Sequence, residues 1–172
     1  LPAPSPLAQG TPPVVSSAQQ RLWFLHQLQP DSCAYHVPEA VELHGALQPE
    51  VLEAALRWLV ERHAVLRSTF VSVEGQPEVR VRPLPASPLL RVESLEDDAD
   101  ALASRLRQQA DAPFSLEDGP LFRFVLWRLS AQHHVLLLVF HHLLVDGLSL
   151  DVLMRELGEA WTALSRGQSP SL

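Results

Sequence analysis

Hydrophobic residues follow two different periods along this chain. Apolar residues recur at three- and four-residue steps through residues 49–60, the spacing of a helix that buries one face. Residues 148–164 repeat this spacing, and residues 16–26 and 97–110 form two shorter amphipathic stretches. Pro49 is also a favoured first residue of a helix. The pattern therefore predicts helices over these four stretches.

The remaining apolar stretches are short and predict strands. Residues 135–140 contain no polar side chain, which is typical of a strand buried on both faces. We expect this strand to form a hairpin with residues 121–129, through a turn at residues 130–132, at the centre of a sheet. The other predicted strands are residues 37–43, a strand that starts near Thr69 and forms a hairpin with residues 78–82, and residues 90–92.

The order of these elements limits the fold class. Helices and strands both occur, but they do not alternate strictly along the chain. Such an order favours an α+β domain with a mixed or largely antiparallel sheet flanked by helices. Residues 1–15 stand apart, because five prolines among small residues favour an extended linker.

Composition excludes several classes of partner and site. The net charge is -7 and the basic residues are scattered arginines without lysine, so no basic patch is available for nucleic acid. Cys33 is the single cysteine, so it cannot form an internal disulfide and leaves no cluster of cysteine and histidine metal ligands. We therefore expect no metal site, and we expect the protein in the reducing cytoplasm. We expect neither secretion nor membrane insertion, since the sequence has no leader and no apolar run of about 18 residues.

Two adjacent histidines, His141 and His142, end the unbroken apolar run. Because successive side chains of a strand point to opposite faces, the two cannot both face one cavity. Imidazole exchanges protons near neutral pH, so a histidine beside a turn is a candidate general base. Asp146 and Gly147 follow as a turn in which glycine can adopt positive φ. The residues leave two interpretations open: one functional and one structural histidine, or two core histidines.

Four motifs in this order resemble those of the condensation domains of nonribosomal peptide synthetases, which belong to the chloramphenicol-acetyltransferase-like acyltransferases. The segment HHLLVDG is similar to the family's HHxxxDG core, and SAQQRLWFL to its opening helix motif. The segment RHAVLRSTF resembles the RHxxLRxxF motif, and FSLEDGPL the FDLxxGPL loop. These segments are residues 141–147, 17–25, 62–70 and 114–121.

The resemblance implies a particular fold and domain layout. Members of this family have two similar lobes, each of about this chain's size, with the active site in the tunnel between them. The resemblance therefore predicts a chloramphenicol-acetyltransferase-like N-terminal lobe over residues 16–166. Residues 1–15 would be the linker before it, and residues 167–172 the start of the connector to a C-terminal lobe. An isolated lobe is expected to be inactive.

The resemblance also implies a reaction and roles for the two histidines. Family members join an acyl or peptidyl thioester to the amine of an aminoacyl thioester, in assembly lines that make peptide secondary metabolites such as antibiotics. His142 matches the second motif histidine, which removes the amine proton or positions the amine. His141 matches the structural histidine, for which we expect a buried, hydrogen-bonding role.

Further roles near the site concern one acidic, one glycine and two arginine residues. Asp146 either orients His142 or forms an ion pair that holds the loop, and we favour the ion pair. Arg67 is the first candidate for its partner and Arg62 the second. Gly147 provides room for the backbone to turn, or space for a pantetheine arm to approach.

The remaining histidines receive weaker expectations. His63 is expected to line the cavity, and His133 and His134 to lie at a strand end. The rest are expected at the surface or in helix caps: His26, His36 and His44.

Cofactors and partners follow from the resemblance alone. No cofactor is expected on this chain, because substrates arrive on the phosphopantetheine of carrier proteins. Expected partners are acyl or peptidyl carrier proteins, adjacent synthetase domains and the second lobe. Two other functions stay open: a noncatalytic module that docks a carrier protein, and an epimerisation-type member.

Three positions depart from the family pattern. Leu148 stands where a tryptophan is common, Ala64 where a glutamate is common, and Ser115 where an aspartate is common.

Overall fold

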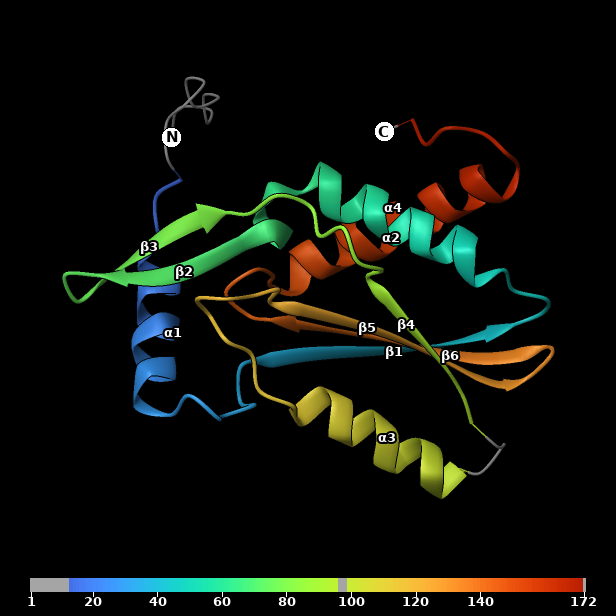
Figure 1. Ribbon diagram of the computed structural model, residues 1–172, viewed down its shortest axis with the longest axis horizontal. Coiled ribbons are helices and arrows are strands. Elements are labelled where there is room, and N and C mark those ends of the chain that lie inside the picture. The colour runs from blue at the N-terminus through green and yellow to red at the C-terminus, as the bar shows by residue number, and fades with distance from the viewer. Residues whose placement is uncertain (1–12, 96–98, 172) are drawn as a thin grey trace.

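The computed structural model describes residues 13–95 and 99–171 of the chain. Four α-helices, six strands and one short 3₁₀ helix occur in this part (Figure 1). The helices are α1 (Ser17–Leu28), α2 (Pro49–Arg62), η1 (Ala64–Arg67), α3 (Ala99–Asp111) and α4 (Gly147–Ser165). The strands are β1 (His36–His44), β2 (Ser68–Val73), β3 (Gln76–Val81), β4 (Leu90–Ser94), β5 (Phe122–Ser130) and β6 (His133–His141).

A four-stranded sheet in the order β1-β6-β5-β4 organises the molecule. β6 pairs antiparallel with both β1 and β5, whereas β4 pairs parallel with β5. The predicted hairpin of β5 and β6 therefore lies at the centre of the sheet, as expected. Helices α2 and α4 lie on one side of this sheet and α3 on the other (Figure 1). The prediction of an α+β fold with a mixed sheet is confirmed.

The two covering layers explain why β6 is continuously apolar. Every residue of β6 after His133 is buried, because it pairs with strands on both edges and has helices over both faces. On α2 the buried residues repeat at three- and four-residue steps, as the sequence predicts, and α2 packs against α4. These residues of α2 are Leu52, Ala55, Leu56, Leu59 and Val60.

Strands β2 and β3 form a separate two-stranded sheet outside the central one. Their turn contains Glu74 and Gly75, both at positive φ, so the predicted second hairpin is confirmed. Gln20 of α1 donates from Nε2 to Oε1 of Gln76 at 3.1 Å, which connects α1 with this hairpin. The hairpin and α1 thus form one end of the molecule.

Some sequence expectations lie at the limits of the described chain. Residues 1–12 of the expected linker, the expected start of the third helix at Asp97, and Leu172 of the expected connector all lie outside the described residues. Residues 13–16 form neither helix nor strand. Within the part that the structure covers, every helix is too short or too polar to cross a membrane.

Gly119 is a position at which the loop before β5 requires glycine. Its φ is +61°, and a Cβ atom there would lie 2.8 Å from Cγ2 of the buried Thr69 in β2. The same loop is joined to β2 by the bond from Phe70 N–H to the Leu116 carbonyl, 2.7 Å. An added methyl group must therefore push the loop away from the strand.

Replacing Gly119 with alanine is expected to lower the free energy of unfolding by about 1–3 kcal/mol, because backbone strain and overpacking act together. Urea unfolding of the chain measures this loss. Gly158→Ala in α4 is the matched control, since nothing lies within 4 Å of its added Cβ and its backbone is helical. That variant should keep or gain stability. Equal losses in the two variants would contradict the close contact with Thr69.

Candidate active site

The end of β6 separates the two adjacent histidines. His141 is the last strand residue and is fully buried, whereas His142 lies in the following loop and is exposed. Their backbone N–H groups donate to different neighbours, His141 to the Leu121 carbonyl at 2.9 Å and His142 to the Tyr35 carbonyl at 2.8 Å. The two side chains therefore occupy different surroundings, as the strand geometry predicts.

The His142 imidazole is fixed by its own loop. Its Nδ1 lies 2.6 Å from the carbonyl oxygen of Val145. A carbonyl oxygen only accepts hydrogen bonds, so in the neutral ring Nδ1 carries the proton and Nε2 carries the lone pair. Sequence reasoning missed this contact, because a backbone acceptor leaves no signal in residue type. The tautomer is the one that a general base acting through Nε2 requires.

A pocket of about 660 Å³ lies between this loop and α1. His142 and the residues after it line one side, and Leu22 and Leu25 of α1 line the other. Gln19 holds the two sides together, because its Nε2 donates to the Leu143 carbonyl at 3.0 Å. The capping box of Ser16 and Gln19 fixes the start of the helix beside the pocket.

His141 has the environment of a structural residue. Its Nδ1 accepts from the Leu143 N–H at 3.1 Å, so the loop after β6 turns around this ring. Burial, followed by the nearby His26, His36 and His142, lowers the pKa of His141 to about 3. The ring is therefore neutral at physiological pH, and this arrangement supports a structural role.

Asp146 is the N-cap of α4. Its Oδ1 accepts from the Ser149 N–H at 2.8 Å and from the Ser149 Oγ–H at 2.6 Å. These hydrogen bonds, the side-chain one first, lower the pKa of Asp146. The signal for this role is in the sequence, because an aspartate directly before an apolar helical stretch is a favoured cap.

The expected ion pair of Asp146 with an arginine was wrong for the described residues. Arg67 donates to the carbonyls of Val60, Glu61 and Arg82, and Arg62 pairs with Glu156 at 3.0 Å. The Asp146 carboxylate instead accepts two hydrogen bonds from Ser149, in the first turn of α4.

Asp146→Ala is expected to lower the midpoint of urea unfolding, whereas Asp146→Asn should retain most of it. Asparagine caps a helix about as well as aspartate, but it carries no charge for an ion pair. Urea unfolding of both variants therefore separates capping from charge. An asparagine variant as unstable as the alanine variant would contradict the capping role.

Gly147 is the first residue of α4 and does not have positive φ, so its expected role in turning the backbone was wrong. Apart from its chain neighbours and the backbone of its own helix, no described atom lies within 4 Å of the place that a Cβ would take. The open space is what the second interpretation, close approach of a ligand arm, would need.

A family model described as Condensation domain matches residues 9–172. The chain belongs to the condensation-domain family. Malpinin synthetase of Mortierella alpina is 40% identical over 172 residues, which is 98% of this chain but 2% of the synthetase. Tyrocidine synthase 3 of Brevibacillus parabrevis is 39% identical over 147 residues, 86% of this chain and 2% of the synthase. The condensation-domain chain thus spans a small part of each relative.

Solved structures agree with this assignment. A variant of the starter condensation domain of rhizomide synthetase RzmA, in complex with C8-CoA, superposes with a TM-score of 0.85 at 27% identity. The match covers 94% of this chain and 38% of the solved one. The X-domain from teicoplanin biosynthesis gives a TM-score of 0.88 at 28% identity, over 99% of this chain and 37% of that one. The condensation-domain fold predicted from the motifs is confirmed.

Three other histidines of this condensation-domain chain have contacts that the sequence did not reveal. His63 bonds Oε2 of Glu156 through Nε2 at 2.7 Å, between α2 and α4, and is not among the residues lining the His142 pocket. His26 is buried, with its ring centroid 5.7 Å from that of His141, and not at the surface. Nδ1 of the half-buried His36 lies 2.7 Å from the Ala110 carbonyl.

Glu156 is a buried charged residue that sequence reasoning missed. Burial acts to raise its pKa, but the hydrogen bond and charge of His63 and the charge of Arg62 lower it. The position was detectable, because Glu156 lies three residues after Leu153 and so on the inner side of the helix. Its pairing joins α4, which begins beside the site, to the end of α2.

The three departures from the family pattern leave the His142 contact unchanged. Ala64 is exposed in η1, and Leu148 is exposed in the first turn of α4. Ser115 accepts from the Asp118 N–H at 3.2 Å and donates to its Oδ2 at 2.7 Å, which stabilises the loop locally. None of the three is hydrogen-bonded to His142 in the described residues.

Proposed function

We propose that this chain is the N-terminal lobe of a condensation domain that forms amide bonds in nonribosomal peptide synthesis. The observation that carries the proposal is His142, exposed at a pocket, with Nδ1 held by the Val145 carbonyl and the lone pair on Nε2. The family assignment supplies the reaction class, and the tautomer supports a base or an amine-positioning group.

The proposed reaction needs no reactant besides its two thioester substrates. The amine nitrogen of an aminoacyl thioester attacks the carbonyl carbon of the donor thioester, so the N–C bond forms and the C–S bond breaks. Nε2 of His142 accepts the amine proton, and a proton returns to the departing thiolate. No cofactor on this chain takes part.

Carrier proteins are the partners that we propose for both substrates. The solved starter condensation domain with C8-CoA supports an acyl thioester as the donor, although that ligand belongs to the other protein. The open space at Gly147 supports the approach of a pantetheine arm to the His142 pocket. The free, exposed Cys33 supports a reducing compartment, for which we propose the cytoplasm.

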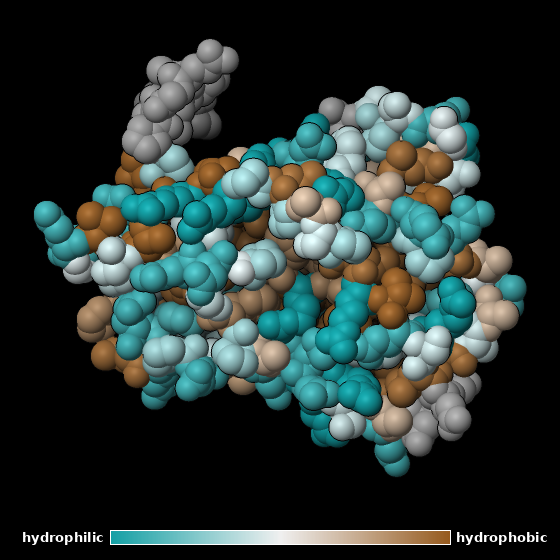
Figure 2. All heavy atoms as spheres, viewed as in Figure 1, coloured by the Kyte–Doolittle hydropathy of each residue, from teal (hydrophilic) through white to brown (hydrophobic). Residues whose placement is uncertain are grey.

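Exposed apolar side chains near the pocket support a second lobe that would cover it. Leu25 of α1 lines the pocket and is 40% exposed, and Leu148 in the first turn of α4 is 81% exposed. Elsewhere on α1, Phe24 and Leu28 are 58% and 64% exposed. Figure 2 shows hydrophobic atoms reaching the surface at the left edge, where Figure 1 places α1. Surface of this kind is typical of an interface with another domain.

A carrier-loaded assay of the natural protein that contains this chain tests the proposal. Donor and acceptor carrier proteins bearing thioesters are mixed with it, and mass spectrometry follows the acceptor. We expect the acceptor to gain the donor acyl group, and the 172-residue chain alone to give no product.

Two other results would contradict the proposal. Binding of carrier proteins without product, over a panel of thioesters, would indicate a docking module. Exchange of the substrate α-hydrogen with solvent deuterium, without amide formation, would indicate an epimerisation-type member.

A further inference from the structure

Three possible metal ligands meet at the far end of the central sheet from His142. Glu42 and His44 are two residues apart on β1, so their side chains project from the same face. His133 is the first residue of β6 and the direct cross-strand partner of His44. The single cysteine led us to expect no metal cluster. This group could not be seen in the sequence, because the pairing of β1 with β6 joins residues about 90 positions apart.

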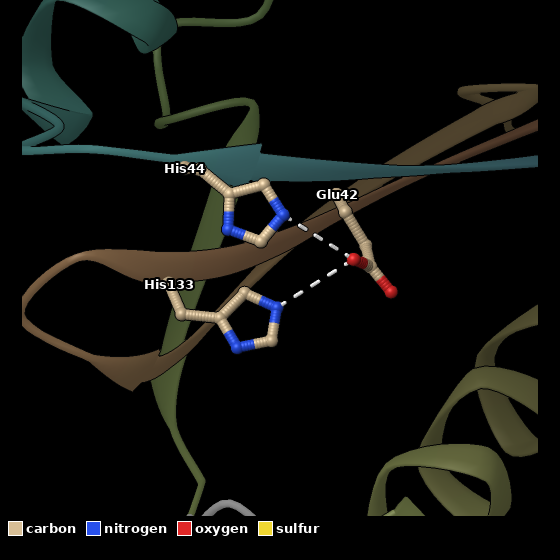
Figure 3. A group of neighbouring side chains, drawn as sticks. All are labelled: Glu42, His44 and His133. Carbon is tan, nitrogen blue, oxygen red and sulfur yellow. Dashed lines mark ion pairs between the residues drawn. The ribbon is translucent and has the colours of Figure 1, made fainter.

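The side chains of these residues converge (Figure 3). Oε2 of Glu42 lies 3.5 Å from Nε2 of His44 and 3.8 Å from Nε2 of His133. The two imidazole rings stack at 15° with their centroids 4.9 Å apart. One ligand atom from each residue lies within 4.8 Å of the other two. This spacing is close to that of ligands around one metal ion.

The Nε2 atom of His133 provides a second observation. It is buried and has no hydrogen-bond partner among the described residues, although its side chain is 28% exposed. A buried nitrogen without a partner is unfavourable. The atom faces the Glu42 carboxylate at a distance that is too long for a hydrogen bond but leaves space for a bridging cation.

From this geometry we infer that Glu42, His44 and His133 form a zinc site. Two imidazole nitrogens and one carboxylate oxygen are a ligand set that Zn²⁺ accepts, with water as the fourth ligand. Magnesium and calcium prefer oxygen ligands, so the two imidazoles select against them.

Rotation of exposed side chains is needed to complete the site. Zinc–nitrogen bonds of 2.0–2.1 Å in a tetrahedron place neighbouring ligand atoms about 3.3 Å apart. Glu42 and His44 have side chains that are 66% and 70% exposed, so both can rotate to close the remaining distance. His133 is held more firmly, because the Gly45 N–H bonds the carbonyl of the preceding Gln132 at 2.9 Å.

The position of the site indicates a structural function. His133 and His141 lie at opposite ends of β6, about 27 Å apart at roughly 3.4 Å per residue. A zinc ion there is too distant to reach a substrate at His142. It would join the edge strand β1 to the central strand β6, and so stabilise the sheet on which the His141–His142 segment depends.

Isothermal titration of ZnCl₂ into the metal-free chain tests the site. One ion is expected to bind per chain, and zinc should raise the thermal unfolding midpoint. Losing a residue that only orients a ligand weakens metal binding by about 10- to 100-fold, so His44→Ala and His133→Ala should weaken it by about 100-fold or more. Glu42→Gln, which keeps the shape but removes the charge, should also bind zinc more weakly.

His142→Ala is the matched control, because it removes an exposed histidine at the other end of β6. It should bind zinc as the unchanged chain does. Co²⁺ provides a second readout, since a four-coordinate site gives strong visible absorption that the His133→Ala variant should lack. Circular dichroism establishes that each variant is folded. No binding to the unchanged chain, or undiminished binding by the His44 and His133 variants, would overturn the inference.

Discussion

Replacing His142 with alanine is expected to slow amide formation by about 100- to 10,000-fold, the usual contribution of a general base. The Val145 carbonyl fixes the ring so that Nε2 can accept the amine proton, and alanine has no group to do so. The measurement is the rate of acyl transfer between carrier-bound thioesters, in the natural protein that contains this chain. Glu159→Ala in the same protein is the control, because Glu159 is exposed on α4 and is not among the residues that line the pocket.

Chemical rescue separates the two roles left open for His142. Imidazole added to the His142→Ala variant can accept a proton in place of the missing ring, but it cannot reproduce a fixed contact that positions the amine. Partial recovery of the rate would therefore indicate proton transfer. No recovery, with a large rate loss, would favour positioning. A His142→Ala variant as fast as the unchanged protein would contradict both roles.

The helices and the central hairpin could be predicted because their signals are local. The three- and four-residue spacing of α2 and α4 follows directly from burial of one helix face. The apolar run of residues 135–140 indicated a strand covered on both faces, and helices on both sides of the sheet cover β6 in this way. The different surroundings of His141 and His142 were predicted from strand alternation, although His142 lies in the loop directly after β6.

Contacts between distant segments could not be predicted in the same way. The parallel pairing of β4 with β5 and the meeting of His44 with His133 depend on which strands become neighbours. The Asp146 ion pair was wrong because charge suggested a distant arginine, whereas the nearest donors were in the first turn of α4. A local cap was the simpler interpretation of the same residue.

Acid is expected to destabilise the chain from about pH 6.5 downward, well above the range in which most carboxylates protonate. Burial lowers the pKa of His141 from 6.5 to about 3. Between these values the unfolded chain binds a proton that the folded chain excludes, so stability falls as pH falls. One such group changes the free energy of unfolding by about 1.4 kcal/mol per pH unit. The stability that the neutral His141 contributes is fully present above pH 6.5 and is lost as the pH falls toward 3.

His26 and His36, which lie beside His141, should also make the folded chain less stable as the pH falls. Burial, with the charge of His36, lowers the pKa of His26 despite Asp31. Burial and Arg123 lower the pKa of His36 more than the Ala110 carbonyl and Asp111 raise it. The unchanged chain should therefore lose stability more steeply than one proton requires.

His141→Asn isolates the contribution of His141. The Asn Oδ1 can accept the Leu143 N–H in place of Nδ1, but the side chain does not titrate. Urea unfolding at intervals between pH 7 and pH 5 should give a flatter pH dependence in the variant, by a difference in slope that approaches about 1.4 kcal/mol per unit toward pH 5. The comparison uses slopes, so a constant loss from poorer packing does not affect it.

Equal slopes in the two proteins would show that His141 is charged in the folded chain, and this would also weaken the proposed mechanism. Proton transfer from the amine makes His142 positive, and a positive ring on the adjacent residue would oppose that charge. A buried and neutral His141 avoids this repulsion while it holds the Leu143 N–H. The pH dependence of folding thus tests whether the first histidine leaves the second free to accept a proton.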